Sequence, residues 1–572
     1  MIMKTPGVYI VEKNAFPNSI VEVATAVPAF IGYTNRAVNG GKSLTNVCWP
    51  VSSMNEYIAH FGGAPEPHFT VEVVADPNAT PTNPPQGTDA RGQVTNFMWN
   101  GKAYRLNRAA GKAGGRFLMH QAMQHFYANG GGRCHIVSVG SYADEIAAGG
   151  IGDYGKPTGL IGGLLPLVQE QEPTMVLTPD AVLLDDPACI KVQRAVLLHC
   201  GSQMRNRFAI LDVWGGELDR KDGHYDCIDG FRADIGTDQL DYAAAYYPWL
   251  HTTLVQPGDI DLAALGEPVD RAALVKLLKD DLGITDDKAA TDPHLHQRAD
   301  VIDDLTKTDT QWADQLKSTI DKGDESDEDK IKAKALVDEQ MAEGDSARTM
   351  LRPTKRLLQE SVAGVSDLYC RIMAEACAQL NLMPPSAAMA GIYTMVDNSH
   401  GVWKAPANVS VNGVAGPAVE LSHDDQEDLN VDAQGKSINA IRSFVGQGTL
   451  VWGARTLDGN SLDWRYINVR RTMIMLEESC RLAARALVFE PNVANTWVTI
   501  KSMVSNFLTG IWKRGGLAGS VPEDAFSVHV GLGETMTPED ILDGILRVTV
   551  LVAVSRPAEF IEITFQQQMQ KA

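Results

Sequence analysis

The pattern of apolar and polar positions predicts a chain in which strands alternate with helices. From Phe117, the sequence FLMHQAMQHFYANGGGRCHIVSV has apolar residues at helical spacing, then three glycines that end the helix, then a strand. The run MVLTPDAVLL predicts a strand, and ACIKVQRAVLLHCGSQM predicts a second helix. RFAILDVW predicts a buried strand that ends in Asp212. This alternation predicts an α/β, or mixed α+β, fold with helices over at least one face of a sheet.

The last third of the chain has the most regular pattern. YINVRRTMIMLEESCRLAARALVF predicts a long helix that stops at Pro491, and NTWVTIKSMVSNFLTGIWKRGG predicts an amphipathic helix. The strand-like runs FSVHVGL, LRVTVLVAV and EFIEITFQQQ follow, with a helix start at Thr537-Pro538 between the first two. The apolar face of the amphipathic helix consists of Trp497, Ile500, Val504, Phe507 and Ile511.

Both ends of the sequence alternate like strands, yet neither has a strand partner nearby. In TPGVYIVEK, Val8 and Ile10 point to one side while Tyr9 and Val11 point to the other. The closing EFIEITFQQQ alternates in the same way. Folded proteins avoid such exposed edges unless the edge pairs with another chain.

Composition narrows the class of protein. The chain has 572 residues, of which 44% are hydrophobic and 21% charged, so we expect a folded, soluble protein. The net charge of -21 disfavours nucleic acid or an anionic membrane as the main partner. Apolar runs such as GLIGGLLPLV are far shorter than the ~20 residues that span a bilayer, and the start lacks the apolar core of a signal peptide. We therefore expect a cytoplasmic protein with no membrane insertion and eight reduced cysteines.

Candidate chemistry is sparse. GIGDYGKPTG matches the phosphate-loop spacing at Gly150, Gly155 and Lys156, but Pro157 replaces the Ser or Thr that would bind Mg²⁺. The histidines show no metal-ligand spacing, and no nucleophile elbow is present. We predict no catalytic, cofactor-binding or metal site; an α/β enzyme with a degenerate phosphate loop is the alternative.

Residues 257–350 differ from the rest in charge. They contain 24 Asp and Glu against 12 Lys and Arg, a net charge of -12, and they have few apolar anchors. This composition favours a solvated helical insertion on an outer surface over a docking face for a basic partner.

Several stretches together resemble the contractile tail sheath family, which phage tails share with phage-like contractile injection systems. They include TPGVYIVE with TAVPAFIGYT near the start, and AGIYTMVDNSHGVWKAPAN, INAIRSFVGQGTLVWGARTLD and INVRRTMIMLEESCRLAARALVFEPN in order further along. The motifs GVWKAPAN, WGARTL and FEPN in that order are the most specific part of the resemblance.

The resemblance implies a sheath core domain built from the N- and C-terminal parts of the chain, with inserted outer domains and terminal β arms. We expect an N-terminal arm and first core strands in 1–39, a variable surface excursion in 40–116, an α/β sheath region in 117–256, the acidic helical insertion in 257–350, a C-terminal sheath core in 351–558 and a C-terminal arm in 559–572. The arms are expected to add strands to sheets of neighbouring subunits. The residues expected to exchange strands are Val8, Tyr9, Ile10, Val11, Phe560, Ile561, Ile563 and Phe565.

The resemblance also implies a function. A sheath subunit polymerises as stacked hexameric rings around an inner tube and contracts to drive that tube through a target envelope. Its expected partners are copies of itself, alone or with sheath paralogues, the inner tube protein, and baseplate and terminator or cap proteins. The particle is a phage tail or an injection particle, released or anchored to a membrane through other components. Lys501, Lys513 and Arg514, on the amphipathic helix, are the candidates to face the tube.

Overall fold

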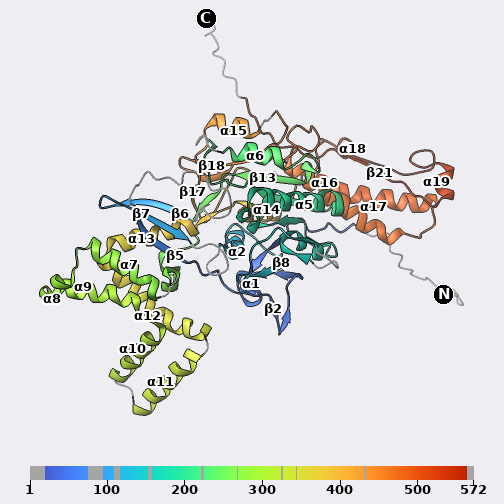
Figure 1. Cartoon of the computed structure of the whole chain (residues 1–572). Helices are drawn as coiled ribbons and strands as arrows, with labels where there is room; N and C mark the ends of the chain where they lie inside the picture. The colour runs from blue at the N-terminus through green and yellow to red at the C-terminus, as the bar shows by residue number, and fades with distance from the viewer. Residues whose placement is uncertain are drawn as a thin grey trace, which may run out of the picture.

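The computed structural model describes residues 20–74, 94–108, 116–151, 157–220, 225–266, 268–323, 326–342, 344–430 and 433–562. Within these ranges the fold has a central α/β core, a helical lobe on one side of it and a long finger on the other (Figure 1). Each of the three parts has a hydrophobic cluster of its own.

The core is a nine-stranded mixed sheet with the order β16-β19-β18-β13-β12-β11-β1-β8-β4. Its middle six strands, from β18 to β8, run parallel, and β4, β19 and β16 are antiparallel to their neighbours. The middle strands are buried on both faces, as parallel strands covered by helices should be. The strands are β1 (Pro28–Thr34), β4 (Cys48–Val51), β8 (Cys134–Ser141), β11 (Met175–Leu177), β12 (Phe208–Asp212), β13 (Ala243–Tyr247), β16 (Val409–Ser410), β18 (Asn439–Phe444) and β19 (Gly448–Val451).

Helices α2 and α14 pack against each other over this sheet (Figure 1). Their close approach depends on Gly391, because a Cβ there would lie 2.5 Å from the carbonyl oxygen of Phe126. The core also contains short two- and three-stranded sheets. Its helices are α1 (Met54–Phe61), α2 (Met119–Ala128), α3 (Gly159–Gly162), α4 (Leu164–Leu167), α5 (Asp186–Leu198), α6 (Cys227–Asp234), α14 (Ser386–His400) and α15 (His423–Asn430).

The lobe combines two distant stretches of sequence around one hydrophobic cluster. Phe69, Phe97 and Leu106, from a three-stranded antiparallel sheet, pack with apolar residues of the helices that follow Pro268. The helical character expected for residues 257–350 is confirmed, but the segment shares its core with strands that the sequence analysis assigned to a separate excursion. The elements are β5 (Phe69–Val74), β6 (Val94–Trp99), β7 (Lys102–Arg108), α7 (Pro268–Asp281), α8 (Asp286–Thr291), α9 (Pro293–Asp303), α10 (Asp309–Lys322), α11 (Asp327–Ala342), α12 (Gly344–Val365) and α13 (Asp367–Leu380).

The finger consists of two long helices and a β-hairpin. The amphipathic helix predicted from the sequence is confirmed as α17, and it buries Ile500, Val504 and Ile511 as expected, with Trp497 and Phe507 half-buried. The hairpin β20–β21 packs on α17, and a capping box at Thr537 begins α19 as predicted. The elements are α16 (Ile467–Ala484), α17 (Ala494–Lys513), α18 (Pro522–Ala525), β20 (Phe526–His529), α19 (Pro538–Leu542) and β21 (Thr549–Val552).

Two sequence predictions need correction. The run MVLTPDAVLL is a strand only over β11, because Pro179 begins a 3₁₀ helix directly after it. Residues 559–562, the described part of EFIEITFQQQ, form no strand within this chain. The eight cysteines all lie in the described ranges, where none is in a disulfide and five are buried.

A buried ion pair joins the finger to the core. Arg471 of α16 donates to both carboxylate oxygens of Asp397 on α14, at 2.9 and 2.7 Å, and the two side chains are only 4% and 2% exposed. The guanidinium also lies 4.8 Å from the ring centroid of Tyr393. Removing one partner of such a pair leaves a charge buried without compensation.

We therefore predict that Arg471→Ala lowers the free energy of unfolding by about 3–5 kcal/mol, measured by urea denaturation. The matched control is Arg133→Ala, which removes the solvent-exposed pair with Glu172 and should cost less than about 1 kcal/mol. Equal losses in the two variants would contradict the role assigned to the buried pair.

Candidate assembly site

The residues expected to exchange strands lie at or beyond the ends of the described chain. Val8, Tyr9, Ile10 and Val11 fall outside the described residues, as do Ile563 and Phe565. Phe560 and Ile561 are described, and they are 76% and 78% exposed. The structure therefore bears on how each terminal segment leaves the folded body, and we call residues 20–27 the N-terminal root and residues 555–559 the C-terminal root.

The N-terminal root is fixed to the core by its main chain. Thr174 donates its hydroxyl to the carbonyl oxygen of Thr25 at 2.7 Å and accepts the N–H of Val27 at 3.0 Å. Arg471, already paired with Asp397, donates to the same carbonyl oxygen of Thr25 at 3.0 Å. The N–H of Val23 donates to the Ser479 hydroxyl on α16 at 3.1 Å. The root is thus held from the core and from the finger at once.

Arg514 belongs to this anchor, which changes its expected role. The sequence analysis placed Arg514 outside as a tube-facing cation, and its side chain is indeed half exposed. Its guanidinium, however, pairs with Glu22 of the N-terminal root and lies 5.1 Å from the ring centroid of Trp403. No local pattern indicates this pairing, because Arg514 and Glu22 are 492 positions apart.

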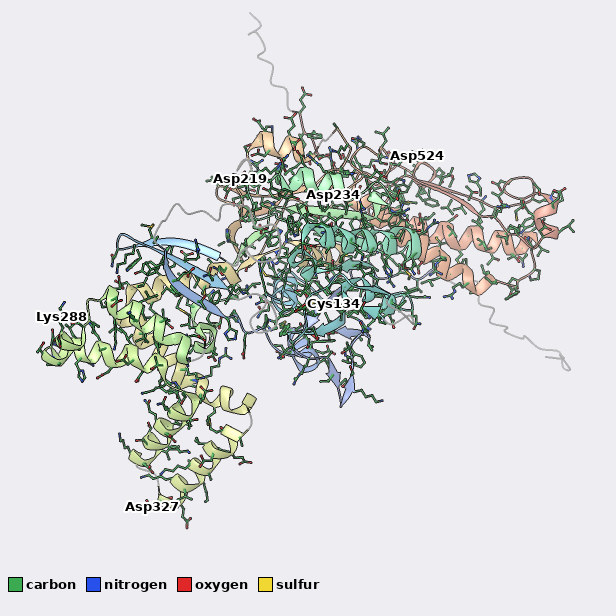
Figure 2. All side chains as sticks on the ribbon, viewed as in Figure 1. Cys134, Asp219, Asp234, Lys288, Asp327 and Asp524 are labelled. Atoms are coloured by element: carbon green, nitrogen blue, oxygen red, sulfur yellow. The ribbon has the colours of Figure 1, made fainter. Side chains whose placement is uncertain are left out.

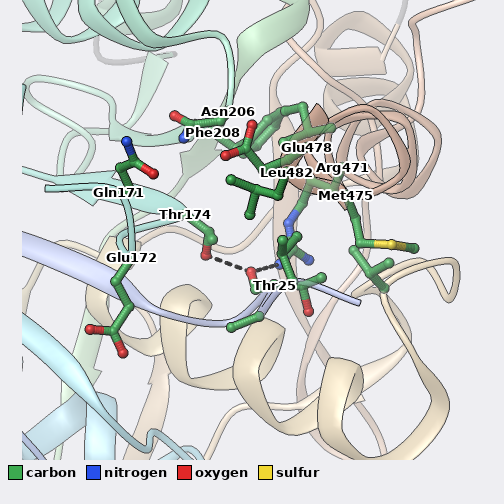
Figure 3. Close-up of a pocket in the computed structure, with 14 residues that line it drawn as sticks. Thr25, Gln171, Glu172, Thr174, Asn206, Phe208, Arg471, Met475, Glu478 and Leu482 are labelled. Atoms are coloured by element: carbon green, nitrogen blue, oxygen red, sulfur yellow. Dashed lines mark hydrogen bonds between the residues drawn. The ribbon is translucent and has the colours of Figure 1, made fainter. Parts of the chain in front are cut away.

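A pocket of about 270 Å³ lies under the N-terminal root (Figure 3). Residues 23–25 form one wall, α16 forms another, and Thr174 and Phe208 belong to the core side. Its three charged lining residues already have partners: Arg471 pairs with Asp397, Glu478 with Arg481 and Glu172 with Arg133. The lining therefore holds the root in place and presents no charged side chain without an ion-pair partner.

The C-terminal root is held by a carboxylate. The side chain of Arg455 is only 5% exposed and binds Glu559 through two nitrogens. Its Nη2 donates to Oε2 at 2.8 Å, and its Nε donates to Oε1 at 3.0 Å. Tyr466 and Asn430 donate to the same carboxylate at 3.1 and 3.2 Å. A bidentate guanidinium–carboxylate pair fixes direction as well as position. Glu559 is therefore part of the folded body, whereas Phe560 and Ile561, directly after it, are exposed.

The two lysines proposed to face a tube are exposed on α17. Lys501 lies close enough to the β20–β21 hairpin to help hold the pKa of Glu534 below its usual value, an effect due mainly to the hydrogen bond from His529. Lys513 is exposed in the last turn of the helix, where it also complements the helix dipole.

Residues that looked enzyme-like do not form a reaction centre among the described residues. Asp212 accepts hydrogen bonds from the backbone N–H and the hydroxyl of Ser386 at 2.8 and 2.5 Å, so it fixes the start of α14. Burial raises the pKa of Asp212 to about 7. Gly150 lies in a short hairpin strand, while Gly155 and Lys156 fall outside the described residues.

In the described ranges, no group of His, Cys, Asp and Glu side chains could hold a metal ion. No helix in these ranges has the length and hydrophobicity that crossing a membrane requires.

Comparison with known proteins shows which solved structures have this fold. Residues 460–568 match the family described as phage tail sheath C-terminal domain. The contracted sheath complex of the extracellular contractile injection system PVC superposes with a TM-score of 0.53 at 22% identity, covering 100% of this chain and 99% of that one. The contracted helical sheath of the anti-feeding prophage gives the same TM-score and identity over 99% and 100% of the two chains. The chain has the fold of contractile tail sheath proteins.

A curated relative supports the same conclusion in sequence. The tail sheath protein of Vibrio phage KVP40 is 26% identical over 187 residues, which are 32% of this chain. The match spans 26% of the length of that phage protein. The resemblance and the mixed α/β fold class predicted from the sequence are confirmed.

We predict that Glu559→Gln weakens the C-terminal root, because a neutral amide cannot balance the buried Arg455 charge. The backbone amides of the C-terminal root should then exchange hydrogen for deuterium several-fold faster than in the unchanged protein, as followed by mass spectrometry. Glu562→Gln, three residues further along and exposed, is the control and should leave the exchange rate of the root unchanged. Equal rates in all three proteins would mean that the root does not depend on Glu559.

Proposed function

We propose that this chain is the structural subunit of a contractile sheath, which polymerises as stacked hexameric rings around an inner tube and shortens to drive the tube through a target envelope. The observation that carries the proposal is a fold likeness over almost the whole chain to two sheaths, both in the contracted state. The free energy for contraction is stored at assembly and released by packing between subunits, without a nucleotide.

The partners follow from this role. The subunit binds copies of itself, alone or together with sheath paralogues, and the inner tube protein along its length. Baseplate and terminator or cap proteins close the two ends of the sheath. Assembly takes place in the cytoplasm, and the finished particle is either a phage tail or an injection apparatus.

We propose that neighbouring subunits are linked by their terminal segments, which add strands to the hairpin β20–β21. That sheet has only two strands in the described chain, so each strand has one edge without a strand partner there. One face of β21 packs on the finger core through Val550 and Val552, while Leu551 is exposed. Each added strand contributes several backbone hydrogen bonds worth about 1 kcal/mol net apiece.

The anchored roots support this linkage. A terminal segment that transmits force between subunits has to be fixed to its own subunit, and both roots are held by buried or half-buried arginines. Because each subunit would be held to its neighbours by such links at both ends, subunits can rotate and slide relative to each other without separating.

We propose that the helical lobe lies on the outer surface of the sheath. Residues 257–350 carry a net charge of -12, and each unpaired carboxylate buried in a tight lattice would carry a desolvation cost of several kcal/mol. Figure 2 places Asp327 of α11 at the far end of the lobe, away from Cys134 in the core. Excision of the entire segment would, however, expose Phe69, Phe97 and the rest of the lobe cluster.

Deletion of either terminal segment tests the proposed function. Removal of residues 1–12 or 560–572 should leave a folded subunit, since both roots stay intact, but no cylinders should form in electron micrographs. The circular dichroism spectrum and melting temperature of the subunit serve as the control for folding. If the truncated chains polymerise and contract normally, the strand-exchange linkage is wrong.

We propose that Lys501 and Lys513 face the tube, since exposed charges add little strength per contact and are screened by salt. The double reversal Lys501→Glu and Lys513→Glu should leave the melting temperature of the subunit nearly unchanged, while extended sheaths fail to form on tubes or contract early. Arg514 is left in place because it pairs with Glu22. Normal assembly with unaltered salt sensitivity would show that this face of α17 does not meet the tube.

A further inference from the structure

The distal end of the finger carries a group of exposed apolar side chains. They come from the loop between α16 and α17 and from the segment at the end of α19, and Figure 1 shows α19 at the far end of α17. The two segments are tied together, because Asn492 donates to the carbonyl oxygen of Ile545 at 3.1 Å and accepts from Trp497 at 2.7 Å. We call this group the tip patch: Val488, Phe489, Val493, Leu542 and Ile545.

Phe489 is the most exposed residue of the tip patch. Its φ is +73°, a conformation that L-residues with bulky side chains rarely adopt, and its side chain is 103% exposed. Main-chain hydrogen bonds from Val488 to Arg485 and from Glu490 to Leu487 keep the loop in this shape. The backbone is thus held in an unfavourable conformation that presents an aromatic ring to the outside. Within the described chain no packing of that ring offsets the strain.

The charges around the tip patch indicate what kind of surface it fits. Glu490, Glu539 and Asp543 are exposed and have no ion-pair partner among the described residues, whereas Arg485 is the one cation near them on the same two segments. Asp540 is already bonded to Arg547. An apolar centre with an acidic rim is complementary to an apolar depression bordered by Lys or Arg.

The position of the finger points to the partner. The acidic lobe and the finger extend from opposite sides of the core, with Asp327 in the lobe and Asp524 above α17 (Figure 2). If the lobe is outermost in the sheath, the finger is innermost. We infer that the tip patch seats against the wall of the inner tube, with Phe489 entering an apolar depression in it; this inference rests on the proposed function.

The tip patch and Lys513 are different contacts. They lie at opposite ends of α17, about 28 Å apart for a helix of 20 residues. A helix that meets the wall end-on brings only the tip patch into contact, whereas a helix that lies along the wall brings both. The tip patch is in contact in either case, so its test does not depend on the result of the lysine reversal.

The test uses the full-length subunit and tubes assembled from the tube protein of the same particle. Phe489→Gly removes the ring and relieves the positive φ, so the melting temperature should stay equal or rise slightly. Binding to tubes in co-sedimentation should weaken about tenfold or more. Cylinders that the subunit forms by itself should remain. Val445→Gly, which removes a 105% exposed side chain from the turn between β18 and β19, is the matched control and should bind tubes normally.

Three results would overturn the inference. Unchanged tube binding by Phe489→Gly would exclude the tip patch as the tube contact. Loss of tube-free cylinders in this variant would make the tip patch a contact between copies of this chain. Equal weakening by Val445→Gly would mean that the effect is not specific to the tip. If the unchanged protein neither forms cylinders nor binds tubes, the proposed function itself fails, a result distinct from the other three.

Discussion

The buried pair between Arg471 and Asp397 is the interaction on which the arrangement of core, finger and N-terminal root depends. One guanidinium bonds a carboxylate of α14, a carbonyl oxygen of the N-terminal root and the face of Tyr393. The free-energy cost of removing this guanidinium from water is offset by these partners acting together. The three parts meet at one charged group, so none can shift there without disturbing the others.

Buried or half-buried arginines bind both terminal roots and one further main-chain segment of this acidic protein. Arg455 holds Glu559 at the C-terminal root, Arg514 holds Glu22 at the N-terminal root, and Arg232 donates to the main chain at Asp428 and Lys436. The planar guanidinium binds carboxylates and carbonyl oxygens at several points, which fixes an angle as well as a distance. Such anchors suit a subunit whose ends are expected to carry load between neighbours.

The molecule is elongated because its three parts have separate hydrophobic clusters. The core sheet, the lobe and the finger each bury their own apolar residues, so the outer two parts extend from the core without disrupting it. This separation allows a charged lobe at one end and an apolar tip at the other (Figure 1). In the proposed sheath, these two ends would present different chemistry to the outside and the inside of the cylinder.

The sequence by itself determined the local elements, because apolar periodicity encodes which face of a segment is buried. It predicted α2, β8 and β12, and it predicted three of the five buried residues of α17, Ile500, Val504 and Ile511. Only the tertiary structure decided which segments meet. Glu559 meets Arg455, and Glu22 meets Arg514. Phe69, Phe97 and Leu106 share a core with apolar residues of helices that follow Pro268. Periodicity says that a face is covered but not by what, since the covering residues are brought there by the path of the whole chain.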